Sequence, residues 1–247
     1  MSSLGPLQVV ALAAVFMSRA LSCGLLAPSI PEVAREFGVS YDQIGTFIAL
    51  LFVGYTATVV LAGRLADQFG RRPLLLFGAV LNGLCTAAIA FVPGTAFLQV
   101  DLFLLGVAGI GDMTATVLLA ESGGASNSRV LSYGHAGFAV GAVVAPLVAG
   151  AALSAGIGYR TLFLGMSGVN ALVVLGIALA RIPEPPHAHK PSGQYRGLLK
   201  TLHVPLGLAT GFLYIAAETG TVMWLPTVLL DRHGASPAVG SAAVSAF

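Results

Sequence analysis

Three ionisable side chains lie inside long apolar stretches of the sequence: Arg19, Asp112 and Glu218. A charge at bilayer depth costs a few kcal/mol, so such side chains generally face a partner or a water-filled cavity and mark functional sites. An arginine suits an anionic solute group or a neighbouring acid, whereas a carboxylate suits proton binding that responds to a nearby arginine or solute. The three residues therefore predict a site for a small solute and a proton.

Two of these residues leave alternatives open. Asp112 is either a proton-binding group or half of a static Arg–Asp pair that joins its helix to the helix of Arg19. Asp101 stands eleven residues before Asp112, close to three helical turns, so both are expected on one helix face as a polar lining. Glu218, in the last apolar run, is the alternative candidate for proton coupling or for binding a solute hydroxyl group.

Two aromatic residues flank Glu218. Tyr214 lies one helical turn before it and is expected on the same side of the helix. Trp224 lies near the end of the run, where it is either a stacking surface for a sugar ring or an interfacial anchor. Arg19, Asp112, Glu218, Tyr214 and Trp224 together form the candidate site for substrate and proton.

The composition requires that these residues sit in membrane helices. Hydrophobic residues make up 56% of the 247 residues and charged residues 9%, against about a quarter charged in soluble domains. The apolar runs have the length that crosses a bilayer. We predict an all-α polytopic membrane protein with an eighth span opening near 235 and seven complete spans at 7–27, 42–62, 73–92, 97–119, 130–153, 160–180 and 203–230.

Several function classes are excluded. A net charge of +2 without a basic stripe gives no support to nucleic-acid binding. Cys23 and Cys85 fall in different apolar runs, so neither a disulfide framework nor a metal-ligand cluster is expected. Metalloprotease and nucleophile-elbow motifs are absent from the sequence, so we expect neither an enzyme nor a cofactor. The last complete run holds no lysine for a retinal Schiff base.

The distribution of Lys and Arg predicts the orientation. A cytoplasmic N-terminus leaves Arg35, Arg160 and Arg232 in outside loops. It places eight basic residues inside: Arg64, Arg71, Arg72, Arg129, Arg181, Lys190, Arg196 and Lys200. By the positive-inside rule we expect a multi-pass cell-membrane protein, in a bacterium the inner membrane, with a cytoplasmic N-terminus and a cytoplasmic central linker.

The linker divides the chain into two units. Residues 181–202 carry four prolines and four Lys or Arg, so we expect a six-helix bundle over 1–180, a cytoplasmic linker over 181–202, and the start of a second bundle over 203–247. The last apolar run is too short to cross a bilayer. We therefore expect a fragment of a protein of about twelve spans, whose missing C-terminal half is its partner.

A motif between the second and third spans carries a family resemblance. It reads G-R-L-A-D-Q-F-G-R-R-P-L-L from Gly63 to Leu75. Gly70 permits a backbone conformation that other residues resist, and Pro73 suits the first turn of a helix. The order resembles the loop motif of the major facilitator superfamily. That resemblance implies a conformational latch to a helix of the other half, formed by Asp67 and Arg71 and supported by Gly63, Gly70 and Arg72.

Two further resemblances point to branches of that superfamily. Gly137, Gly141, Pro146 and Gly150 partly match the glycine-proline motif of drug/proton antiporters, although small residues at this spacing also serve close helix packing. The stretches H-A-G-F-A-V-G-A from His135 and L-Y-I-A-A-E from Leu213 resemble the fucose-permease-like branch.

The branch resemblance decides the expected function. It implies a secondary transporter for a small sugar-like or anionic solute, coupled to protons as a symporter; the alternative is a drug or metabolite/proton antiporter. Many proton antiporters carry an arginine near the outer end of helix four, where this sequence has Asp101, and this departure favours symport.

Overall fold

The computed structural model describes residues 4–122, 127–183 and 203–246. These residues form ten α-helices: α1 (Pro6–Gly24), α2 (Leu26–Phe37), α3 (Tyr41–Phe69), α4 (Arg71–Ile89), α5 (Thr95–Val107), α6 (Ile110–Ser122), α7 (Asn127–Ser154), α8 (Tyr159–Ala180), α10 (His203–His233) and α11 (Pro237–Ala246). Seven helical stretches are long and apolar enough to cross a membrane. The predicted all-α polytopic fold is confirmed, and the linker beyond residue 183, with Lys190, Arg196 and Lys200, lies outside the described residues.

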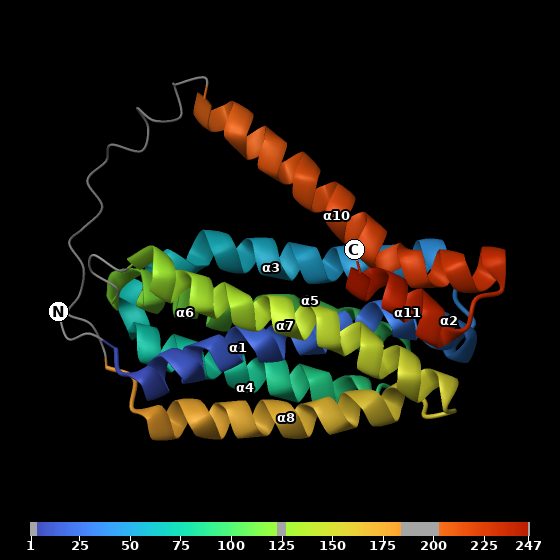
Figure 1. Ribbon diagram of the computed structural model, residues 1–247, viewed down its shortest axis with the longest axis horizontal. Coiled ribbons are helices and arrows are strands. Elements are labelled where there is room, and N and C mark those ends of the chain that lie inside the picture. The colour runs from blue at the N-terminus through green and yellow to red at the C-terminus, as the bar shows by residue number, and fades with distance from the viewer. Residues whose placement is uncertain (1–3, 123–126, 184–202, 247) are drawn as a thin grey trace.

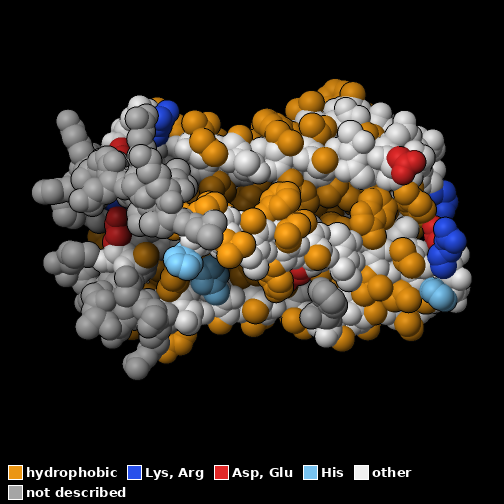
Figure 2. Space-filling view, turned by 90° about the horizontal axis from the view of Figure 1, so that it is seen from above, with side chains coloured by type: hydrophobic (Ala, Val, Ile, Leu, Met, Phe, Trp, Pro, Cys, Tyr) orange, Lys and Arg blue, Asp and Glu red, His pale blue; other side chains and the backbone are white. Residues whose placement is uncertain are grey.

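The long helices α1 and α3 to α8 run side by side and form one bundle (Figure 1). Apolar side chains cover its length, and charged side chains gather at its two ends (Figure 2). We call the end that carries Gly70 the motif end, and the end where Glu36 and Tyr159 lie the far end. Helix α10 packs against α2 and α11, whereas its first half stands apart from the bundle with Leu213 and Tyr214 exposed (Figure 1).

The first span is longer than predicted, because the chain continues as helix α2 through Phe37 instead of entering a loop. Helix α2 begins anew at Leu26, so Pro28 falls in its first turn, where a backbone N–H has no intrahelical acceptor. Gly38 then ends the helix in the left-handed conformation, with φ of 62°.

The motif turn is shorter than predicted. Helix α3 runs through Phe69 and α4 begins at Arg71, so Gly70 alone makes the turn, with φ of 85°. That angle confirms the need for glycine at this position. Pro73 lies in the first turn of α4, as expected.

The fourth span is broken, which corrects the prediction of one continuous helix over 97–119. Helix α5 ends at Val107 and α6 begins at Ile110. Three glycines stand within six residues there, and each costs about 1 kcal/mol of helix stability relative to alanine. The amides of Ala108 and Gly109 bond to carbonyl groups of the last turn of α5, and the hydroxyl of Thr58 donates to the Val107 carbonyl at 3.1 Å. The break removes the basis for placing Asp101 and Asp112 on one helix face.

Two apolar clusters fill the bundle. The far-end cluster includes Leu25, Phe47, Leu105 and Phe163. The motif-end cluster includes Leu12, Leu75, Leu118 and Ile177. Buried polar residues of α1, α4 and α8, together with Asp112 of α6, lie between the two clusters, and we call this set the polar layer: Arg19, Ser22, Asn82, Thr86, Asp112 and Asn170.

The glycine-proline stretch of α7 is a packing surface. A β-carbon at Gly137 would lie 2.5 Å from the backbone oxygen of Ala13, and one at Gly141 would lie 2.6 Å from that of Met17. Pro146 is among the fully buried side chains. Gly150 faces α11 instead, where a β-carbon would lie 2.5 Å from that of Ser241. The small residues thus let α7 approach α1 and α11 closely.

We predict that Gly141→Ala lowers the melting temperature of the purified protein in detergent by several degrees. The added methyl group forces α1 and α7 apart, and overpacking of this kind costs about 1–3 kcal/mol. Gly176→Ala on α8 is the matched control, because nothing lies within 4 Å of its would-be β-carbon. Equal melting temperatures for the two variants would contradict the packing role.

Candidate solute and proton site

Arg19 is the centre of the polar layer. It is buried on α1, and its Nη1 donates hydrogen bonds to the Leu105 carbonyl at 2.6 Å and to Asn82 Oδ1 at 3.3 Å. Its Cζ lies 6.0 Å from the ring centroid of Tyr55, at the limit of a cation–π contact. Within the described residues Nε and Nη2 donate no hydrogen bond, so this edge of the guanidinium is available to an acceptor.

The Leu105 carbonyl is available to Arg19 because α5 stops two residues later. The last four carbonyl groups of a helix lack intrahelical partners, and they carry the negative end of the helix dipole. A guanidinium placed there satisfies one orphan carbonyl group and is itself stabilised. The break in the fourth span is therefore part of the site.

Asp112 lies in the first turn of α6, buried and on the other side of the break. It interacts electrostatically with Arg19 and Tyr55. No described Lys, Arg or His lies within ion-pair distance, 4.0 Å, of its carboxylate, and Oδ1 accepts no hydrogen bond there. The direct Arg19–Asp112 pair considered as the alternative is not formed. The two groups are close enough to sense each other's charge without contact.

Four polar side chains extend the site toward the far end. Ser22 Oγ accepts hydrogen bonds from Asn82 Nδ2 at 3.2 Å and from Asn170 Nδ2 at 3.1 Å. It also lies 3.1 Å from Thr86 Oγ1, which donates to the Asn82 carbonyl at 2.6 Å. This network joins α1, α4 and α8, and it includes Asn82, which also binds Arg19. Asn170 Oδ1 is buried without a hydrogen bond in the described part of the chain. The sequence offered only isolated polar residues in separate spans and no sign of this convergence.

The structure does not bring the predicted residues of the seventh span to this site. Glu218 is half-buried on α10 and makes no hydrogen bond or ion pair with the described residues. Tyr214 is 64% exposed. Trp224 packs edge-on against Tyr41 at the far end, with ring centroids 6.1 Å apart, so it holds α10 to the start of α3.

At the motif end Arg71 has a partner within its own bundle. Its Nη2 donates to Glu121 Oε1 of α6 at 2.6 Å, and the Arg71 side chain is 8% exposed. Asp67 has no ion-pair partner among the described residues, and the space around Gly63 is open. The latch to the other half, which also involves Arg72, stays a prediction.

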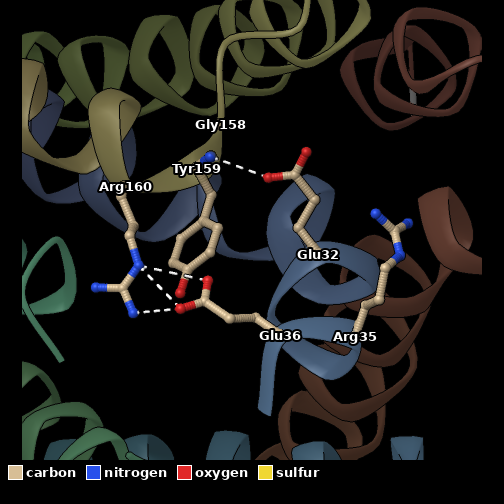
Figure 3. Close-up of a pocket in the computed structure, with 6 residues that line it drawn as sticks. All are labelled: Glu32, Arg35, Glu36, Gly158, Tyr159 and Arg160. Atoms are coloured by element: carbon tan, nitrogen blue, oxygen red, sulfur yellow. Dashed lines mark hydrogen bonds and ion pairs between the residues drawn. The ribbon is translucent and has the colours of Figure 1, made fainter. Parts of the chain in front are cut away.

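A second polar cluster, missed by the sequence analysis, lies at the far end (Figure 3). Arg160 of α8 binds Glu36 of α2, with Nε 3.1 Å from Oε1, and donates to the carbonyl groups of Ala90 and Val92. Glu32 Oε2 accepts the backbone N–H of Tyr159 at 3.0 Å, which caps α8 in place of an N-cap side chain. The cluster lines a cavity of about 280 Å³.

Comparison with known proteins gives a family model that matches this chain and several proteins of similar sequence. The family model of the Major Facilitator Superfamily matches residues 12–247. Multidrug resistance protein MdtM of Salmonella typhimurium is 27% identical over 228 residues, which cover 87% of this chain and 54% of that protein. Tetracycline resistance protein, class B, of Escherichia coli is 32% identical over 136 residues, or 53% of this chain and 34% of that protein.

Solved structures share the arrangement of helices. A bacterial homologue of the human lysosomal transporter Spinster, in an inward-facing and unoccupied conformation, superposes with a TM-score of 0.78 at 17% identity, over 97% of this chain and 59% of that chain. The D-xylose-proton symporter superposes with a TM-score of 0.68 at 15% identity, over 96% of this chain and 65% of that chain. These comparisons do not single out the fucose-permease-like branch, which stays a prediction.

We predict that Glu121→Gln lowers the melting temperature of the purified protein, because it leaves the buried Arg71 guanidinium without its carboxylate. Loss of one partner of a buried pair costs about 3–5 kcal/mol, and less here because Glu121 is 30% exposed. Asp67→Asn, an acid in the same region without a described partner, is the control. If both variants melt at the same temperature, the ion pair does not stabilise the bundle.

Proposed function

The chain belongs to the Major Facilitator Superfamily, and from this premise we propose that it forms the solute- and proton-binding half of a proton-coupled transporter. Family and fold make it a membrane transporter and not an enzyme. Transporters built in two halves bind solute near the bilayer midplane and expose it alternately to each side. The polar layer, midway between two apolar clusters, supports that location for the site.

Asp112 carries the proposal. A buried ionised carboxylate with an oxygen that lacks a donor, as Oδ1 of Asp112 does, is costly, and a bilayer supplies no water to compensate it. The carboxylate therefore needs a proton or the charge of Arg19. Because Arg19 is held by the Leu105 carbonyl and by Asn82, Asp112 is free to take the proton. A solute that draws on the charge of Arg19 then changes how tightly the proton is held.

Arg19 supports an anionic solute. Its unused Nε and Nη2 form the edge that binds a carboxylate or phosphate in a bidentate manner. Tyr55 adds an aromatic face and a hydroxyl group beside it, and the sulfur of Met113 lies 3.9 Å from that hydroxyl. This mixed lining suits an aromatic or amphiphilic compound with one anionic group.

We further propose export by proton antiport as the direction of transport. The relatives named for drug resistance, MdtM and the class B tetracycline protein, support this direction. Symport of a sugar-like solute is the second candidate, supported by the helix-five and helix-seven stretches that resemble the fucose-permease-like branch. The proposed orientation places the motif end and the 181–202 linker in the cytoplasm by the positive-inside rule.

The domain division is also part of the proposal. We assign residues 1–180 to one bundle, 181–202 to the linker, and 203–247 to the start of the second bundle. Among the described residues, α10 packs on the first bundle with its far-end half, through Trp224 and α2. Movement of α10 about this contact would open and close access to the polar layer from the motif end.

We predict that Asp112→Asn abolishes proton-coupled transport. The native-length protein is reconstituted in liposomes with a pH-sensitive dye inside and challenged with sugars, organic anions and amphiphilic drugs. Solute-driven proton movement should fall at least about tenfold, as for loss of a positioned proton-transfer group, because asparagine cannot carry the proton. Glu218→Gln should remain within about twofold of the unmutated protein, since Glu218 lies outside the polar layer.

Two results would contradict the proposal. Proton movement that persists in Asp112→Asn and disappears in Glu218→Gln would move the coupling group to α10. Protons that follow the solute would indicate symport and contradict the proposed antiport, whereas protons that move against the solute indicate antiport.

A further inference from the structure

A second acid lies in the far-end apolar cluster. Asp101 is 8% exposed, and it stands on α5 between the buried Leu98 and Leu102 of that cluster. Its Oδ2 accepts no hydrogen bond from the described residues. A charged carboxylate at this depth costs free energy, so an acid retained there marks a functional site. Neither the solute site nor the ion pairs at the two ends use Asp101.

The position of Asp101 relative to Arg19 follows from two helices. On α5, Asp101 stands four residues before Leu105, whose carbonyl group binds Arg19, and four residues span about 6 Å along a helix. On α4, Cys85 lies beside Asp101 and three residues after Asn82, which also binds Arg19. Asp101 therefore lies about one helical turn from the atoms that hold Arg19, on the far-end side.

Few charged groups surround Asp101. Helices α3 and α4 pack against α5. From α4 the thiol of Cys85 lies beside the carboxylate. Helix α3 meets α5 through Gly54, which lies against the backbone of Phe103, and it brings no titratable group to Asp101 among the described residues. Arg19 interacts electrostatically with Cys85, the neighbour of Asp101.

We propose that Asp101 is a second proton-binding site, which exchanges protons with Asp112 past Arg19. In this step the O–H bond of the Asp101 carboxylic acid breaks, water carries the proton along the polar layer, and the Asp112 carboxylate forms the new O–H bond. No other atom or electron is exchanged. Metal ions such as Ca²⁺ need six or more oxygen ligands, and a single carboxylate beside a thiol offers no such set, so the ligand is a proton.

The proposal rests on the proposed function for the role of Asp112, but the site at Asp101 is testable by itself. Two acids on opposite sides of one arginine give each side of the membrane its own proton acceptor. The apolar side chains of Leu98 and Leu102, with Ile89 and Phe47, line a small cavity between Asp101 and the far end. This apolar lining separates Asp101 from the far-end surface in the present conformation.

Infrared difference spectroscopy tests the proposal without a solute. The native-length protein in liposomes is titrated with acid and base, and the carbonyl band of protonated carboxyl groups is followed. We expect Asp101→Asn to remove one component of this band and Asp112→Asn to remove another. The component of Asp101 should remain in Asp112→Asn, because the two acids are separate proton-binding sites.

Matched variants separate protonation from folding. Asp42→Asn, at an exposed acid of the far end, should leave the buried-carboxyl band unchanged. Cys85→Val should move the frequency of the Asp101 component and leave that of Asp112 in place. If Asp101→Asn does not fold, Asp101→Glu should retain the component at a shifted frequency. An unchanged band in Asp101→Asn, or a Cys85→Val spectrum identical to that of the unmutated protein, overturns the proposal. If Asp101→Asn removes its component but Asp112→Asn leaves the band unchanged, the proposed function is overturned instead.

Discussion

The buried guanidinium of Arg19 sets the main constraint on this structure. A permanent positive charge in the middle of an apolar bundle needs acceptors, and no carboxylate of the described residues touches it. The strongest acceptor is the Leu105 carbonyl at 2.6 Å, which is free only because α5 ends at Val107. The arginine and the broken fourth span thus require each other. A continuous helix would use that carbonyl group internally and leave the charge without its main partner.

The break in turn shapes the neighbouring helices. Its orphan carbonyl groups need donors, which come from the turn amides and from Thr58 of α3. The Thr58 hydroxyl reaches the break only if α3 and α5 approach closely, and a β-carbon at Gly54 or Gly106 would collide with the facing backbone. The glycines of these two helices therefore serve the polar layer indirectly, through the distance between the helices.

Hydropathy predicted the seven spans because the free energy of transfer of a segment to the bilayer depends only on the residues of that segment. The turn at Gly70 and the helix start near Pro73 were likewise predictable from residue type. The contacts of Arg19 with Asn82 and of Ser22 with Asn170 were not, since these pairs are brought together from positions 63 and 148 residues apart. The Arg160–Glu36 contact and the end of α5 depend in the same way on partners supplied by other helices.

The same limit explains why Glu218 was grouped with Arg19 and Asp112. The sequence predicts how deep in the membrane a residue lies along its helix, but it does not predict the direction in which the helix tilts. Helix α10 tilts away from the bundle (Figure 1).

The two ion pairs bear on how such a protein moves. Arg71–Glu121 ties α4 to α6 at the motif end, and Arg160–Glu36 ties α8 to α2 at the far end. Both join helices of the same bundle, so they resist internal rearrangement and leave α10 as the element with few attachments. Tyr41 and Trp224 meet at the far end, and the described residues of α10 make no aromatic contact with the bundle at the motif end. Packed interiors switch between discrete arrangements more readily than they deform. A change of charge at the polar layer is therefore expected to move the bundle as a whole relative to α10, about the contact at the far end.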